Sequence, residues 1–111
     1  MASFGENAVH AWARIDQTGT QSIVDSYNIT SITDNGVGRT IFTFSTNAIN
    51  NDFVFVGMAG NENSTTTSGR TQNNDGAATT SGFRIRNFSV SGSADTTRDD
   101  NLVNVIVLSD N

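Results

Sequence analysis

The 111 residues of this chain include 6 basic and 11 acidic side chains, giving a net charge of −5, and no proline or cysteine. Without cysteine, neither disulfides nor Cys-ligated metals are available, and without lysine or a basic excess, nucleic acid is not an expected partner. The length suits a single domain, 1–111, in which residues 1–7 are expected to form an N-terminal arm. Abundant Asn, Thr, Ser and Gly favour strands and turns, so we expect an all-β protein.

The chain contains no run of eighteen apolar residues and no basic start followed by an apolar segment. We therefore expect a soluble chain with no Sec-type export signal and no membrane insertion.

Clean alternation between apolar and polar residues predicts the first strand at 8–16. The face expected in the core is formed by Val9, Ala11, Ala13 and Ile15. The opposite face, a mixture typical of a contact surface, is formed by His10, Trp12, Arg14 and Asp16. A turn at 17–20 predicts a hairpin with a second strand over 21–29, in which a bulge near Asp25 is expected.

Residues 31–38, Ser-Ile-Thr-Asp-Asn-Gly-Val-Gly, predict a hairpin corner. The Asn35-Gly36 pair accepts positive φ at both central positions of a tight turn, and Gly38 adds another permissive position. We assign Asp34 and these three residues a structural role in the turn. In the strand that follows, over 39–46, Phe42 and Phe44 share the face expected in the core.

Two later segments, 53–59 and 102–108, are apolar on both faces, apart from Asn104 in the second. Both are expected to be covered on two sides, and the last strand is expected to be central in its sheet. The polar tract 61–81 is expected to be a long loop, either disordered or a binding loop.

A strand over 82–90 changes phase partway along its length. Phe83 and Ile85 are expected to point inward and Arg84 and Arg86 outward, and a bulge near Asn87 would restore the register after them.

About six or seven strands follow from these patterns, which suits an antiparallel β-sandwich or a jelly-roll-like domain. A single thin sandwich cannot readily bury both faces of two strands that are apolar on each side. We therefore expect a homo-oligomer, with a trimer as one candidate.

The residues expected at an interface are His10, Trp12, Arg14, Arg84, Arg86, Asp99 and Asp100. Arg84 and Arg86 suit a clamp for a carboxylate, a glycan acid or the acidic pair of a neighbouring copy. The alternative is that their charge protects a sheet edge from aggregation. Trp12 either closes the end of the core or anchors a contact, and its position opposite Val9 and Ile15 favours a contact.

No catalytic, metal-binding or cofactor-binding residues are assigned. His10 with Asp16 or Asp25 evokes a nucleophilic triad, but the chain has no Gly-x-Ser-x-Gly elbow, so we expect a protein that is not an enzyme. Calcium could find oxygen ligands in loops, but the spacing of an EF-hand is absent. Those loop carboxylates are Asp34, Asp75, Asp95, Asp99 and Asp100. Three Asn-x-Ser/Thr triplets, at Asn28, Asn63 and Asn87, are expected by chance in this composition.

Residues 11–20, Ala-Trp-Ala-Arg-Ile-Asp-Gln-Thr-Gly-Thr, and the later Ser-Ile-Thr-Asp-Asn-Gly-Val-Gly corner occur in a specific order. This arrangement resembles a β-rich domain of tailed, often marine, bacteriophage virion proteins, found frequently in tail fibres. That family runs approximately Ala-Trp-Val-x-Phe-x-Gly-Thr-Gly-Thr and then Ser-Ile-Thr-Asp-Asn-Gly-x-Gly. The likeness covers roughly 11–60, with a looser match over 82–108. It departs at Gln17, often Gly in the family, and at 47–50, where the family tends to have a Pro-containing turn.

The resemblance implies a non-enzymatic structural protein of the virion and carries over no catalytic residue. Because the chain shows no coiled-coil or collagen-like shaft, we expect an accessory protein on the particle exterior, of the capsid decoration or cement type. It would be made in the host cytoplasm and would contact the major capsid or tail protein. The alternatives are a tail-fibre tip or receptor-binding knob, and a carbohydrate-binding module that recognises a host surface glycan.

Overall fold

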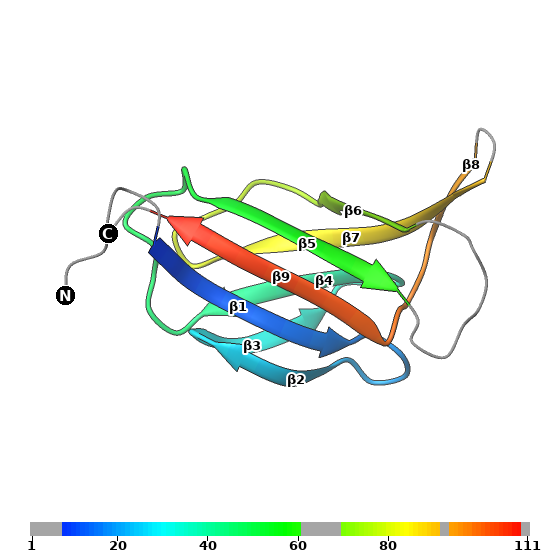
Figure 1. Cartoon of the computed structure of the whole chain (residues 1–111), viewed down its shortest axis with the longest axis horizontal. Helices are drawn as coiled ribbons and strands as arrows, with labels where there is room; N and C mark the ends of the chain where they lie inside the picture. Colours follow the sequence, from blue (N-terminus) through cyan, green and yellow to red (C-terminus); the bar gives the residue numbers. More distant parts are fainter. Residues whose placement is uncertain (1–7, 61–69, 92–93, 110–111) are drawn as a thin grey trace.

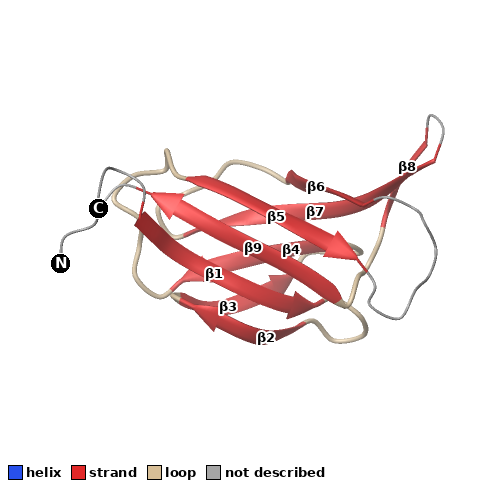
Figure 2. Ribbon diagram, in the orientation of Figure 1, coloured by secondary structure: helices blue, strands red, loops and turns tan. Residues whose placement is uncertain are grey.

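A computed structural model describes residues 8–60, 70–91 and 94–109. Within these ranges the chain forms strands and no helix. Figure 2 shows the strands and the loops that join them. The expected N-terminal arm, 1–7, lies outside the described residues. None of the described segments is a helix that could span a membrane. The strands are β1 (Ala8–Asp16), β2 (Ser22–Tyr27), β3 (Ile29–Asp34), β4 (Arg39–Phe44), β5 (Val54–Gly60), β6 (Arg70–Asn74), β7 (Gly82–Ser91), β8 (Ala94–Thr97) and β9 (Leu102–Ser109).

The strands form two antiparallel sheets packed face to face, in which β1, β9 and β5 cross in front of β4 and β7 in Figure 1. Sheet A has the order β2-β1-β9-β5, and sheet B has the order β3-β4-β7-β6, with β8 paired to β7 beyond this path. The sandwich expected from the sequence is confirmed. So is the central place of the last strand, because β9 lies between β1 and β5.

The described part of the chain has nine strands rather than six or seven, because β3 is a strand of its own and because β6 and β8 form within tracts that lack apolar alternation. Both β6 and β8 are held by backbone pairing to the long strand β7. The expected loop 61–81 is therefore partly strand: Arg70–Asn74 is β6, while 61–69 lies outside the described residues.

Phenylalanine rings fill the space between the sheets. Phe42 and Phe83 stack with ring centroids 4.8 Å apart, and Phe55 lies 4.5 Å from Phe83. Phe42 and Phe44 are buried, as their shared face predicts. Burying each such ring contributes about 2–3 kcal/mol, so this cluster is a main source of stability.

The hairpin of β1 and β2 contains the irregularity expected near Asp25. Arg14 pairs with Asp25 and Ile15 pairs with Ile23, so Val24 is an extra residue opposite this step. A second register shift, between Val9 and Ala11, was not expected. Its consequence is that Val9 is 48% exposed instead of lying in the core with Ala11.

The predicted strand 21–29 ends at Asn28: Ser22–Tyr27 is β2 of sheet A, and Ile29 begins β3 of sheet B, which continues to Asp34 through residues expected in the hairpin corner. The φ of 57° at Asn28 breaks the extended backbone, so the chain leaves sheet A at Tyr27 and enters sheet B at Ile29. The Asn28 amide supports this crossing by donating to the backbone oxygens of His10 and Thr46, at 3.0 and 3.1 Å.

The bulge expected near Asn87 is absent, since β7 pairs with β4, β6 and β8 without a register shift. Alternation therefore continues, and Asn87 points inward, fully buried. Phe88 lies on the outer side of sheet B, where the Arg86 guanidinium sits 4.8 Å from its ring centroid. Pairing on both edges of β7 fixes this register more strongly than the hydrophobic pattern alone does.

Candidate interaction surface

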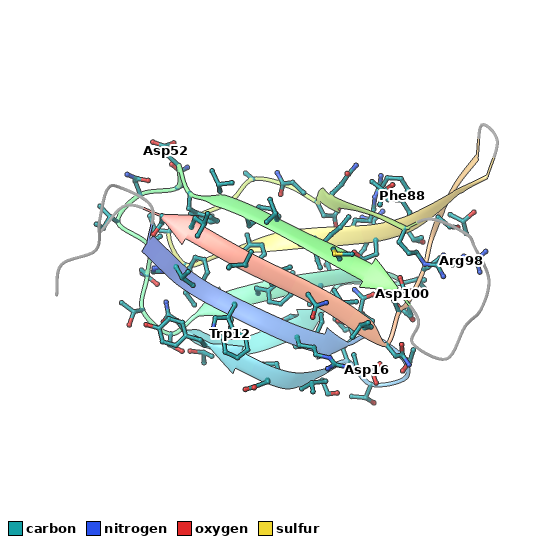
Figure 3. The ribbon with its side chains drawn as sticks, in the orientation of Figure 1. Trp12, Asp16, Asp52, Phe88, Arg98 and Asp100 are labelled. Carbon is teal, nitrogen blue, oxygen red and sulfur yellow. The ribbon has the colours of Figure 1, made fainter. Side chains whose placement is uncertain are left out.

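The outer face of sheet A carries apolar side chains in rows across all of its strands. Cross-strand pairing aligns one row of Tyr27, Trp12, Ile106 and Val56. The neighbouring row places Leu108 between Val9 and Val54. We define the apolar face as Val9, Trp12, Tyr27, Val54, Val56, Met58, Ile106 and Leu108. Figure 3 shows Trp12 on β1, with sheet A toward the viewer.

Much of this face is open to solvent, although both β5 and β9 were expected to be covered on two sides. Met58 is 75% exposed, Val56 58% and Trp12 38%. The inward residues of the same sheet are fully or almost fully buried, as Ala11, Val105 and Val107 illustrate. Sheet B covers the inner side of sheet A, and no described element covers the outer side.

A groove runs along this face between β5 and β9. Its volume is about 360 Å³, and it is lined by Val56, Met58, Asn104 and Ile106, among others. Contiguous apolar surface of this kind is rare on monomeric soluble proteins, so this face is the candidate interaction surface.

A polar row borders the apolar face on the side toward the β1–β2 turn. Arg14 lies between Asp25 of β2 and Asn104 of β9, and Met58 continues the row on β5. Arg14 thus stands on the face where the sequence placed it, at the margin of the apolar surface.

His10 is not part of the apolar face, although the sequence placed it beside Trp12. It occupies the register shift of β1, and its half-buried ring packs edge-on against Phe44, with centroids 4.7 Å apart. Asp16 lies six residues further along the extended strand, about 20 Å away. Asp25 pairs with Arg14, so these groups do not assemble into the triad considered from the sequence.

Asp99 and Asp100 act within the chain. Asp99 accepts a hydrogen bond from the Gly38 backbone, and Asp100 is fully buried with both carboxylate oxygens 3.0 Å from Nε of Arg70. Asp100 is therefore not available to the arginines of a neighbouring copy, as was considered from the sequence. Figure 3 shows Asp100 near the end of the sandwich, where β5 and β9 meet the loops.

The hairpin corner has the expected structural role but a different backbone. Gly36 and Gly38 have φ of 120° and 68°, whereas Asn35 is not among the described residues with positive φ. Asp34 accepts from the Gly36 N–H at 2.9 Å and closes a local turn. The corner therefore spans 35–38 instead of a two-residue Asn-Gly turn.

A buried polar cluster beside this corner was missed from the sequence. Gln17 donates to Thr40 Oγ1 at 3.0 Å and accepts from the Asn87 amide at 3.0 Å and from the Asp100 backbone at 3.2 Å. All four residues are fully buried. Oδ1 of Asn87 has no hydrogen-bond partner among the described residues. Gln17 follows a strand end in a polar turn, which gives no signal of burial.

Arg84 and Arg86 lie on the outer face of sheet B. Their strand, β7, is an interior strand with β4 on one side and β6 on the other. Protection of an exposed sheet edge therefore does not account for them. Arg39 of β4 is directly opposite Arg86, so the surface carries a third arginine that the sequence did not single out.

Most of the loop carboxylates considered for calcium have partners in the chain. Asp34 caps its turn, Asp75 pairs with Arg39, and Asp99 and Asp100 are engaged as described above. Within the described ranges, no group of three or more His, Asp or Glu residues is placed to hold a metal ion. The side chain of Asp95 lies outside the described part.

Two of the three Asn-x-Ser/Thr asparagines have structural roles. Asn28 bonds across the two sheets, and Asn87 is buried in the polar cluster. Asn63 lies outside the described residues.

Comparison with protein-family models, with curated proteins and with solved structures finds no match for this chain.

Proposed function

We propose that this protein is a non-enzymatic structural component on the exterior of a tailed-phage particle, of the capsid decoration or cement type, and that it works as a homo-oligomer. The observation that carries the proposal is the exposed apolar face of sheet A. The resemblance of residues 11–60 to a phage virion domain supports the location on a phage particle. The exposed apolar face supports assembly as a homo-oligomer.

A second copy is the occupant that best fits this face. Four strands at about 4.8 Å spacing and seven residues at about 3.3 Å rise make a flat area of roughly 20 by 23 Å. Two such faces in contact would bury on the order of 1,000 Å², the size at which specific interfaces begin. Flat apolar sheets also pack readily on one another at about 10 Å separation.

The rows indicate how two copies would meet. A twofold axis parallel to the strands brings β1 of one copy over β9 of the other and keeps each row opposite itself. Trp12 then packs on Ile106 of the second copy, and Tyr27 packs on Val56. The polar row also meets its own counterpart, which places Arg14 on Asn104 and Asp25 on Met58 of the second copy, at the margin of the apolar contact. Such an isologous contact gives a dimer rather than a trimer.

Self-association can be tested with two valines that are equally exposed. Val56 and Val37 are each 58% exposed, but Val56 is on the apolar face and Val37 is in the hairpin corner. Analytical ultracentrifugation should show an oligomer for the wild type and for Val37→Lys, and a monomer for Val56→Lys. A wild-type monomer at micromolar concentration would contradict self-association through this face.

The proposed location on the phage particle is tested separately by mixing purified protein with undecorated capsids, with host cells and with a glycan array. Binding to capsids alone supports a decoration role. Binding to cells or sugars would contradict it and would favour the receptor-binding alternatives.

One feature favours carbohydrate as the second candidate. A hollow of about 440 Å³ at the end of the sandwich places the Tyr27 ring beside His10, Ser45 and Thr46. An aromatic ring flanked by hydroxyl groups suits a sugar, which presents an apolar face and polar edges. Tyr27→Ala should abolish any glycan signal if this hollow is responsible.

A further inference from the structure

Three of the six arginines gather on the outer face of sheet B, on the opposite side of the molecule from the apolar face. Arg39 and Arg86 are direct cross-strand partners, and Arg84 stands next to Arg86 on the same face of β7, opposite Ile41. We call Arg39, Arg84 and Arg86 the arginine cluster. Directly opposed like charges destabilise a sheet, so their placement calls for a compensating interaction.

Among the described residues, the carboxylate paired with this cluster is that of Asp75, which comes from the far side of β7. Asp75 follows β6, and its backbone N–H donates to the Arg84 oxygen, which places it beside β7. Arg39 starts from β4, on the other side of β7, yet its guanidinium reaches both Asp75 oxygens at 3.2 and 3.3 Å. The Arg39 side chain must therefore cross β7 in the neighbourhood of Arg84 and Arg86.

Packing holds these side chains in place. The Arg86 guanidinium stacks over the buried ring of Phe88, and Arg39 is fixed by its contact with Asp75. The Arg84 stem lies along the loop after β6, where a Cβ on Gly76 would meet it at 3.7 Å. Side chains that are already ordered lose less conformational entropy when they bind a ligand.

The charge of the cluster remains largely uncompensated. Among the described residues, no carboxylate forms an ion pair with Arg84 or Arg86, so three guanidiniums and Asp75 leave a local charge of about +2. This positive surface belongs to a chain whose net charge is −5. It is therefore a distinct anion-attracting region on an otherwise acidic protein.

We propose that the arginine cluster binds an acidic segment of a partner protein through at least two carboxylates. Arg84 and Arg86 are two residues apart on one strand face, about 7 Å, which equals the spacing of alternate side chains in an extended segment. Guanidiniums bind carboxylates in bidentate pairs, and the flat, open sheet suits an extended chain better than a single sugar, which needs a pocket. This inference does not depend on self-association or on a virion location.

The test uses a fluorescent hexaglutamate peptide and the full chain, with anisotropy measured at about 20 mM salt, where charge interactions are weakly screened. The wild type should bind the peptide. The affinity of Arg84→Gln/Arg86→Gln should be at least about tenfold weaker, because the variant loses one or more charge-assisted contacts. The control with the same charge change is Arg14→Gln/Arg98→Gln, which should retain wild-type affinity. Arg14 is on sheet A, and the Arg98 Nε donates to Oγ of the buried Ser89 at 3.3 Å, away from the outer face of sheet B. Arg84→Lys/Arg86→Lys keeps the charge but not the bidentate geometry, and should give an intermediate affinity.

Three outcomes would overturn the proposal. The first is no binding of hexaglutamate by the wild type, and the second is an equal loss in the control double variant. The third is tighter binding of oligogalacturonate than of hexaglutamate, which would indicate an acidic glycan instead of a protein segment. Circular dichroism of each variant verifies that the fold is intact.

Discussion

The Asp99 carboxylate accepts a 2.7 Å hydrogen bond from the backbone N–H of Gly38, a residue 61 positions earlier in the chain. The Gly38 oxygen in turn accepts from the Asn87 N–H at 2.8 Å. The hairpin corner is thus held on both sides by distant backbone, and its conformation is part of the tertiary structure.

Gly38→Ala should destabilise the protein by about 3 kcal/mol or more, because φ is +68° and a Cβ would lie 2.6 Å from the oxygens of Asn87 and Arg98. Gly19→Ala is the matched control. Its φ is +64°, but no atom lies within 4 Å of the added Cβ, so the cost should be only about 1 kcal/mol. Urea denaturation of both variants measures the difference, and equal losses would show that the close packing of Gly38 carries no cost.

Gln17→Leu should cost about 2–4 kcal/mol, since it removes the acceptor for the Asn87 amide and the Asp100 N–H, both buried. Leucine has a similar size, so the loss reports the unpaired polar groups and not a cavity. The exposed Thr20→Ala variant should change stability by less than about 0.5 kcal/mol. An unaffected midpoint for Gln17→Leu would mean that solvent reaches the cluster.

Asp100→Asn should lower the free energy of unfolding by about 3–5 kcal/mol, because the largely buried guanidinium of Arg70 would lose its ion pair with the fully buried Asp100 carboxylate. Asp75→Asn removes the ion pair with Arg39, whose side chain is 38% exposed, and should cost about 1 kcal/mol or less. Thermal unfolding at low and high salt distinguishes the two stability losses, since salt should reduce only the loss caused by Asp75→Asn. A larger loss for Asp75→Asn than for Asp100→Asn would contradict the burial of the Arg70–Asp100 pair.

The carboxyl of Asp16 has a pKa below its ordinary value, because the Thr18 hydroxyl and then the Thr18 N–H donate to it. A pKa that is lower in the folded state stabilises the protein above the unfolded pKa, and this contribution is lost as the pH falls through the folded value. Thr18→Ala should raise the Asp16 pKa toward its ordinary value in an NMR pH titration. An unchanged titration would mean that the backbone N–H alone lowers it.

Local pattern predicted much of the sandwich. Alternation in β1 placed Ala11, Ala13 and Ile15 in the core, and the aromatic residues of β4 were assigned correctly. The weak pattern of β2 indicated the irregularity at Asp25, because a bulge leaves its trace as a phase change.

The pattern was misleading at two other places. In β7 the apparent change reflects Asn87, a polar residue on the inner face, and Phe88, an apolar residue on the outer face covered by Arg86. At Asn28 the chain changes sheets within a run that looked continuous. A one-dimensional pattern cannot distinguish a residue on the other face from a residue in the other sheet.

The sequence by itself determined the all-β class, the turns, most of the core and the excess of apolar residues on β5 and β9, because these follow from alternation and turn chemistry between near neighbours. Only the tertiary structure decided that this excess forms one face with Trp12, that Asp100 is buried against Arg70, and that Arg39 joins Arg84 and Arg86. These depend on which strands pair and in what register. Such pairing is set by contacts between residues far apart in the chain, and no local pattern records it.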